Sequence, residues 1–489
     1  MLLCICSFFF SCEGDLEPQN FNTLDPSTFF QNADDADAVL TGFYNRFNGG
    51  WGGTFYNNST YMANVVSTDE MYSQWGDGGI WERLNEFRWT PLTSETRDAY
   101  NNFIVGVTIG TNTIENLETI PMDEDLKDRF ISEVRAGRAI MVWILFNNYG
   151  PPPVVVDPEI TLNPNTDFDP ERPTVQWTVD FIESELIAAE PHLPARWDVS
   201  NFGRFSAAAA KMARLKLYMH QKQWQKAVDV SAEIMALGEY SLVQSSYKMI
   251  FDAGNEANEE IIWALPRSFD QTLGPANTWM AAVLPGDFRT ETIPANELVS
   301  WNGFRTPWSF YDKFETGDDR LEVMIKDYYI DGPDGPELID GRATGKLAGA
   351  LPLKYGIDPN REGARATNDL IIWRYADVLM LRAEALNEIT PLSGEAQQLV
   401  QQVRDRSNAG QIPVSALTDQ SSFRDFILDE RGREFFCEGV RREDLIRHGK
   451  FIQTALDEGF TFASPHHVLF PIPQPAIDAN PKIKQNDGY

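Results

Sequence analysis

Residues 373–409 read WRYADVLMLRAEALNEITPLSGEAQQLVQQVRDRSNA, and this stretch decides the fold class. Apolar residues recur at steps of three and four in each half: Tyr375, Leu379, Ala383 and Leu386, then Ala396, Leu399, Val400 and Val403. This spacing predicts two amphipathic helices. Pro391 and Gly394 lie between them and favour the end of one helix and a reversal of the chain. A helix pair of about thirty-four residues is the length of one tetratricopeptide-type unit.

A second stretch, Ser206 to Gly238, repeats the pattern of Arg374 to Asn408. Because neither helix of such a pair can bury its apolar face alone, we expect stacked neighbours. The sequence therefore predicts a mainly α fold, with a tetratricopeptide-type helical repeat scaffold and a large irregular, loop-rich ligand-binding region. The expected scaffold segments are 30–48, 107–149, 174–240 and 370–450, and the expected loop-rich segments are 49–91 and 261–365.

Smaller features are expected between these segments. Residues 261–265 are typical of a short strand, residues 331–336 of a turn-rich loop, and the proline-rich tail 470–489 of mostly extended chain. Cys437 has no partner for a disulfide framework if the N-terminal cysteines are lost or lipidated, so we expect a buried thiol.

The charge balance restricts the class of partner. The 489 residues include 41 Lys and Arg against 72 Asp and Glu, a formal net charge of −31. A phosphate backbone or an anionic lipid surface would be repelled by most of such a surface, so no nucleic acid partner is expected. A neutral or cationic ligand fits the charge, as does simple solubility.

The N-terminus MLLCICSFFFSC is apolar but too short to span a bilayer. It lacks the positively charged start of a secretory signal, so we expect the sequence to begin inside one. Ser11 and Cys12 followed by EGDLE resemble a lipobox, with Phe9 where leucine is usual. We therefore predict a signal peptide over 1–12 and lipidation of Cys12; a cleaved soluble signal is the alternative.

Several segments resemble the SusD/RagB family of surface glycan-binding lipoproteins of Bacteroidota. They follow the family's order: STDEMYSQWGDGGIWERLNEFRWTP (67–91), SWNGF and FYDKFETGDDR (300–320), WRYADVLMLRAEALNE (373–388), DERGREFFCEGVRREDLIRHGK (429–450) and FPIPQPAIDANPKIKQNDGY (470–489). The resemblance implies a single domain over 13–489 whose loop-rich part holds the ligand site. It also implies an outer-membrane, cell-surface location through the lipid anchor, and a SusC-like TonB-dependent transporter as partner. The acidic run after Cys12 is similar to that phylum's surface-export signal. Cys437 and Gly439 depart from the family pattern and concern packing.

Tryptophans gather in the two irregular windows. Residues 51–89 and 279–308 hold seven of the 13 tryptophans. Flat aromatic rings take the apolar face of a sugar, and amide, carboxylate and guanidinium groups bind its hydroxyl rim. The predicted stacking residues are Trp75, Trp81, Trp301 and Trp308, and the predicted rim-binding residues are Asp77, Glu82, Asn302 and Arg305. Loops also bury tryptophan as an anchor, and that alternative stands for each ring. Core positions are expected for Trp89, Trp143, Trp224 and Trp373.

The charged segment 429–450 places several acids close together, but arginines interleave with them. This pattern indicates ion pairs and not the two carboxylates across a cleft that a glycosidase needs. Arg374 and Asp377 are expected to form a polar pair, and no catalytic residue is predicted.

No His or Cys motif for a metal is present, so neither metal nor cofactor is predicted. The turns GDD at 317–319 and DGPDG at 331–335 have ligands for a structural calcium ion, although such turns are commonly plain.

The sequence thus predicts a non-enzymatic, surface-anchored protein that binds an oligosaccharide or polysaccharide and delivers it to an outer-membrane transporter. A neutral glucan is favoured because of the negative charge. The alternative is a peptide-binding lid of the same architecture, in which amides and main chain, not flat indoles, would bind the ligand.

Overall fold

The computed structural model describes residues 30–48, 59–75, 79–163, 165–166, 168–270 and 275–489. The predicted signal peptide 1–12, Cys12 and Asp77 lie outside the described residues, so the structure does not test them.

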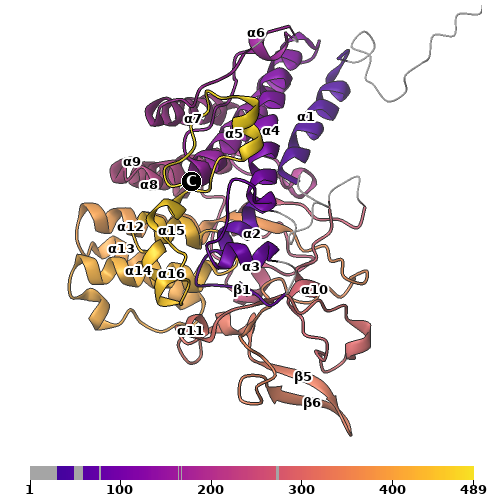
Figure 1. The fold of residues 1–489 in the computed structure, drawn as a ribbon, viewed down its shortest axis with the longest axis vertical. Helices are drawn as coiled ribbons and strands as arrows, with labels where there is room; N and C mark the ends of the chain where they lie inside the picture. Colours follow the sequence, from indigo (N-terminus) through magenta and orange to yellow (C-terminus); the bar gives the residue numbers. More distant parts are fainter. Residues whose placement is uncertain (1–29, 49–58, 76–78, 164, 167, 271–274) are drawn as a thin grey trace, which may run out of the picture.

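A stack of helices forms the frame of the molecule (Figure 1). The helices are α1 Ala33–Asn48, α2 Ser59–Val66, α3 Ile80–Asn85, α4 Ser94–Thr119, α5 Glu124–Tyr149, α6 Pro158–Thr161, α7 Val175–Ala189, α8 Ala207–His220, α9 Trp224–Ala236, α10 Trp279–Val283, α11 Trp308–Tyr311, α12 Tyr375–Ile389, α13 Gly394–Arg406, α14 Gln420–Phe435, α15 Arg441–Arg447, α16 Phe451–Asp457 and α17 Gln474–Ala479. Short 3₁₀ helices add η3 Glu190–His192, η4 Val199–Asn201, η5 Tyr247–Ile250, η6 Ala295–Glu297, η7 Asp319–Glu322, η8 Val414–Leu417 and η9 Pro465–Val468.

Neighbouring helices pack in a continuous series. α4 packs on α5, α5 on α7, α8 on α9, α9 on α12 and α12 on α13. This is the stacking of helix pairs that the apolar spacing predicts, and the mainly α, tetratricopeptide-type fold is confirmed. The loop-rich part of the chain is inserted between α9 and α12, which still pack together. In Figure 1 this part projects from the helical frame, and the hairpin of β5 and β6 forms its tip.

The α8–α9 pair shows how local sequence sets this frame. Ser206 accepts a hydrogen bond from the backbone N–H of Ala209 at 3.2 Å, which satisfies a free donor at the start of α8. Residues 207–210 are four alanines, all buried, so neighbouring helices approach closely. Gly238 ends the pair with a φ of 70°, as its position after α9 predicts.

Short antiparallel ribbons attach the insert to the frame. The pairs are β1 Tyr72–Ser73 with β3 Phe304–Arg305, β2 Ile261–Leu265 with β8 Leu370–Arg374, β4 Met324–Ile325 with β7 Leu351–Pro352, and β5 Asp327–Gly332 with β6 Gly335–Asp340. β2 has the bounds that the sequence predicts. β8 leads directly into α12, so the insert enters the scaffold through a buried two-stranded ribbon.

Three predicted boundaries need correction. α4 begins at Ser94 and not near residue 107, because buried Ala99, Tyr100 and Phe103 are surrounded by polar residues that hide the helical period. α2 and α3 lie inside the segment expected to be irregular. The turn-rich loop 331–336 is the tight turn of the β5–β6 hairpin, since each strand supplies part of that segment.

The C-terminal tail returns to the N-terminal half of the chain. The N–H of Phe470 donates to the carbonyl of Asn148 at 2.8 Å, and the side-chain amide of Asn486 donates to the carbonyl of Tyr149 at 3.0 Å. Trp89 donates through Nε1 to the Tyr489 hydroxyl at 2.7 Å. The tail 470–489 was predicted to be mostly extended; it contains the short helix α17 and is otherwise without regular secondary structure.

Cys437 is a buried free thiol, as predicted. Its backbone N–H donates to Oε2 of Glu70 at 3.1 Å, whereas Oε1 of Glu70 has no hydrogen-bond partner. Burial raises the pKa of Glu70 to about 8, against the lowering effect of Arg441. The folded protein therefore holds a proton on Glu70 that the unfolded chain releases at lower pH.

This difference predicts a pH dependence of stability. The folded-state pKa of Glu70 lies above its ordinary value of 4.5. The free energy of unfolding therefore falls as the pH rises from about 4.5 to about 8. Glu70→Gln removes the titration. The wild type should lose about 1.4 kcal/mol per pH unit relative to the variant within that window. Urea unfolding of both proteins across the window measures it, and parallel curves would contradict the prediction.

Candidate functional site

The two tryptophan-rich windows meet at one surface. β1 pairs with β3, with Tyr72 opposite Arg305 and Ser73 opposite Phe304. The N–H of Gln74 donates to the carbonyl of Gly303 at 2.6 Å. The structure therefore joins two stretches that lie more than two hundred residues apart, as a binding surface built from both windows requires.

Trp75 is held at this junction by contacts with the other window. Its Nε1 donates to the backbone carbonyl of Trp301 at 2.7 Å. Its ring packs on Phe304, with centroids 5.0 Å apart and planes 57° apart. Gly303 lies directly against the ring, because a Cβ built on Gly303 would come within 2.3 Å of two ring carbons. Trp75 is half-buried, so its indole is fixed by three contacts and still reaches the surface.

Trp301 is the exposed member of the surface, with 37% of its area accessible. Its loop is held by α10. The N–H groups of Trp301 and Gly303 donate to the carbonyls of Ala281 and Ala282 at 2.7 and 2.8 Å. An exposed indole on a loop whose backbone is bonded to a buried helix costs little conformational entropy when a ligand binds.

Asn302 lies next to Trp301 and is exposed, with a φ of 51° in the left-handed region. Arg305 is only 2% exposed, which corrects its prediction as a rim-binding residue. Its guanidinium donates to the carbonyls of Val283 and Phe304 at 2.7 and 2.6 Å and also contacts the side-chain oxygen of Asn302. Burial lowers the pKa of Arg305 to about 10. Arg305 therefore supports the loop from inside.

Trp81 is a second correction. It is 4% exposed and packs edge-on against Phe304, with centroids 6.3 Å apart. The anchoring alternative applies to this ring, because α3 turns it into the core. Glu82 follows on α3 and is half-buried.

Trp308 begins α11 and is half-buried. Tyr311 packs edge-on to it at 5.5 Å, and the guanidinium of Arg342 lies 4.7 Å from the ring centroid. Arg342 is oriented by Asp312, at 2.6 and 2.9 Å. One face of Trp308 is thus covered by a cation.

The described part of the candidate surface therefore consists of Trp75, Trp301 and Asn302. Trp308 lies on a separate element, at the start of α11. Gly303 was not among the predicted site residues. In the sequence, Gly303 follows Trp301 and Asn302 in the SWNGF segment. Glycine is needed there because the Trp75 ring, from the other tryptophan-rich window, packs against this position.

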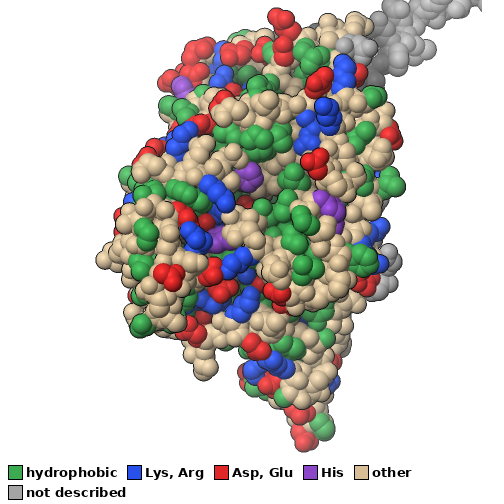
Figure 2. All heavy atoms as spheres, turned by 60° about the vertical axis from the view of Figure 1, so that its left-hand side comes forward, with side chains coloured by type: hydrophobic (Ala, Val, Ile, Leu, Met, Phe, Trp, Pro, Cys, Tyr) green, Lys and Arg blue, Asp and Glu red, His purple; other side chains and the backbone are tan. Residues whose placement is uncertain are grey.

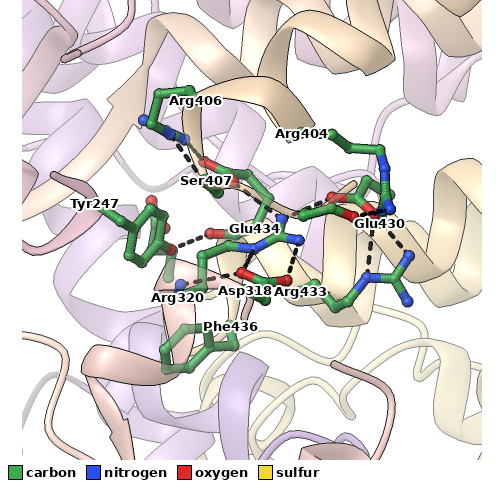
Figure 3. Close-up of polar contacts among 12 residues, drawn as sticks. Tyr247, Asp318, Arg320, Arg404, Arg406, Ser407, Glu430, Arg433, Glu434 and Phe436 are labelled. Atoms are coloured by element: carbon green, nitrogen blue, oxygen red, sulfur yellow. Dashed lines mark hydrogen bonds and ion pairs between the residues drawn. The ribbon is translucent and has the colours of Figure 1, made fainter. Parts of the chain in front are cut away.

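Glu430 and Glu434 of the segment 429–450 contact arginines (Figure 3). Glu434 accepts hydrogen bonds from Arg374 at 2.6 Å and from Arg320 at 3.2 Å. Glu430 accepts one from Arg320 at 2.7 Å. Burial alone would raise the pKa of Glu434, but the surrounding arginines lower it to about 2. A carboxylate held ionised in this way is no proton donor near neutral pH, and the ion-pair interpretation of this segment is confirmed.

Arg374 is fully buried at the centre of this network. Its guanidinium reaches three carboxylates at 2.6–2.8 Å: Glu260, Glu434 and Glu438. The predicted pair of Arg374 with Asp377 is wrong. Asp377 instead binds Lys216 at 2.9 Å and Arg431 at 2.7 Å, because Arg374 still belongs to β8 whereas Asp377 lies in the first turn of α12.

The two turns considered for calcium serve other contacts. Asp318 of the GDD turn binds Arg320 at 2.7 Å, and DGPDG closes the β5–β6 hairpin. Within the described residues, no group of three or more His, Cys, Asp or Glu is placed to hold a metal ion.

The face shown in Figure 2 carries basic and acidic side chains intermixed, without a continuous basic stripe. Among the described residues, no helix combines the length and the apolar character that a membrane span requires.

Comparison with known proteins supports the resemblance seen in the sequence. Residues 344–489 match the model of the SusD family. The chain is 26% identical to the SusD-like protein P25 of Formosa agariphila, over 98% of this chain and 96% of that protein. Residues 344–489 thus match the SusD family, and nearly the whole chain is similar to a SusD-like protein.

Other SusD-like proteins are similar to most of the chain. The starch-binding protein SusD of Bacteroides thetaiotaomicron is 24% identical over 88% of this chain and 85% of that protein. A solved laminarin binding SusD-like protein has the same fold, with a TM-score of 0.76 at 24% identity, covering 94% of this chain and 100% of that chain.

Proposed function

We propose that this protein binds an oligosaccharide or polysaccharide on the surface formed by Trp75, Trp301 and Asn302. The observation that carries the proposal is the junction of the two windows, in which Trp301 is exposed while Trp75 is fixed by Gly303 and Phe304. Two indoles at one rigid surface suit the apolar faces of successive sugar rings, and the exposed amide of Asn302 suits their hydroxyls.

The ligand class that we propose is a neutral glucan. The net charge of −31 disfavours a polyanionic polysaccharide. Two relatives are described as starch-binding and laminarin binding, and both of these polysaccharides are glucans. The buried, arginine-paired acids of α14 support a role in binding and not in hydrolysis.

The location and the partner follow from the family resemblance and from the N-terminal sequence. In this proposal Cys12 carries lipid, residues 13–489 act as one domain at the outer cell surface, and the bound glycan passes to a SusC-like TonB-dependent transporter. The lipobox-like Ser11-Cys12 supports the anchor.

Affinity electrophoresis against a panel of soluble neutral and acidic polysaccharides tests the binding. Trp301→Ala and Trp75→Ala should each weaken retardation by a glucan about tenfold or more, because each removes a central aromatic contact. Trp177→Ala is the matched control, since Trp177 is 39% exposed on α7 and stacks on Phe181 away from the proposed surface.

Unchanged retardation in both surface variants would contradict the proposed site. Retention of a peptide ligand by all variants, with no glycan retained by the wild type, would favour the peptide-binding alternative. A pure sample incubated with the bound glycan should release no new reducing ends.

A further inference from the structure

A cavity of about 120 Å³ lies inside the helical frame, away from the loop surface. Side chains from α1, α2, α4, α5, α8, β2 and β8 line it, together with residues 438–440 and Glu443 at the start of α15. Its apolar wall is aromatic: Phe47, Tyr61, Phe103, Trp143, Trp263 and Trp373. Trp263 and Trp373 lie 5.1 Å apart between ring centroids, as neighbours on the β2–β8 ribbon.

A second cavity of about 150 Å³ adjoins the first. The two share four lining residues: Trp143, Asn147, Lys216 and Glu443. Lys216 is 3% exposed and forms an ion pair with Glu443 at this boundary. We call the two cavities together the inner chamber.

Two asparagines of the chamber wall have an unused acceptor. The side-chain amide of Asn64 donates to the carbonyl of Thr60 at 3.0 Å, and that of Asn148 donates to the carbonyl of Ile144 at 2.9 Å. Each amide nitrogen is therefore turned toward its own helix. Asn64 and Asn148 are only 8% and 3% exposed. The side-chain oxygen of each is buried and has no hydrogen-bond partner. A buried acceptor without a donor costs about 1–3 kcal/mol, which an occupant of the chamber would recover.

The charged groups that line the first cavity are already paired. Lys216 binds Asp377 at 2.9 Å in addition to Glu443, and Glu438 binds Arg374 at 2.8 Å. A charged occupant of the first cavity would therefore meet only charged groups that already have a partner. The unused groups are neutral acceptors beside aromatic rings.

We propose that the inner chamber is a binding site for a small neutral polyol, the size of one sugar ring or smaller. Its hydroxyls donate to the side-chain oxygens of Asn64 and Asn148, and its C–H face lies against the aromatic wall. This site is separate from the Trp75–Trp301 surface and does not rest on the function proposed there.

Saturation-transfer NMR with D-glucose and myo-inositol as probes tests the site, with methylammonium as a cationic probe. Wild type should give a signal with at least one polyol and none with methylammonium. The signal should persist in a Trp75→Ala/Trp301→Ala protein, which lacks the loop surface. It should fall at least fivefold in Asn64→Leu/Asn148→Leu, which removes both acceptors at similar side-chain volume.

Asn112→Leu is the matched control. Asn112 also has a buried side-chain oxygen without a partner, but it lies outside the chamber wall, so its replacement should leave the polyol signal unchanged. Circular dichroism of each variant checks the fold. If the double asparagine variant does not fold, Asn148→Ala alone replaces it.

Three results would overturn the proposal. The first is no polyol signal with the wild type, which would leave ordered water as the partner of the two acceptors. The second is a polyol signal lost only with the loop tryptophans. The third is binding of methylammonium without binding of either polyol.

Discussion

Arg374→Met should lower the free energy of unfolding by about 3–5 kcal/mol, because it leaves buried carboxylates without their shared cation. Arg374 is fully buried and contacts Glu260, Glu434 and Glu438 at 2.6–2.8 Å. Methionine fills a similar length but supplies no donor. Chemical denaturation followed by circular dichroism measures the loss.

Lys450→Met is the matched control for the change of charge. Lys450 pairs with Asp425 at 2.6 Å, but both side chains are more than 40% exposed. An exposed pair contributes about 0–1 kcal/mol, so this variant should unfold almost as the wild type does. Equal losses in the two variants would show that burial of the Arg374 network adds no stability beyond that of an exposed ion pair.

Gly303→Val should reduce glycan binding about as much as Trp75→Ala, although position 303 carries no side chain that could touch a ligand. A Cβ at this position would come within 2.3 Å of the Trp75 ring, so the indole must leave its place and lose its bond to the Trp301 carbonyl. Affinity electrophoresis against the glucan measures the effect. The fold should persist, because the displaced ring is half-buried at the surface.

Gly286→Val serves as the control within the same loop-rich part. A Cβ at Gly286 meets only the Ser300 hydroxyl, at 3.7 Å, so this change should leave binding intact. Full glucan retention by Gly303→Val would show that the position of Trp75 does not matter for the ligand.

The helical frame was predictable because its signal is local. In 206–238 and 373–409 the apolar residues that meet in the core are three or four residues apart, so one segment of sequence contains the pattern. The start of α4 was not predictable in this way. Its first turns bury Ala99, Tyr100 and Phe103 among polar residues, so the spacing of apolar residues there is too weak to indicate where the helix begins.

The candidate surface was predictable in composition and not in arrangement. Tryptophan-rich loops indicated aromatic contacts, and the ring of one predicted residue, Trp75, does contact the backbone of another, Trp301. Whether a given ring faces solvent depends on residues far along the chain. Phe304 covers Trp81, and Arg342 covers one face of Trp308, and neither contact has a signature in the sequence near those tryptophans.

The return of the tail to α5 has a consequence for how the protein is made. A polypeptide emerges from the ribosome N-terminus first. The hydrogen bond between the carbonyl of Tyr149 and Asn486 therefore forms only after a further 337 residues have been synthesised. The bond between Trp89 and Tyr489 forms only after a further 400 residues. Until then the end of α5 lacks its covering segment. Closure of this corner is a late event in biogenesis, and a ribosome that stalls before the tail is translated leaves a product whose oldest helices are still uncovered.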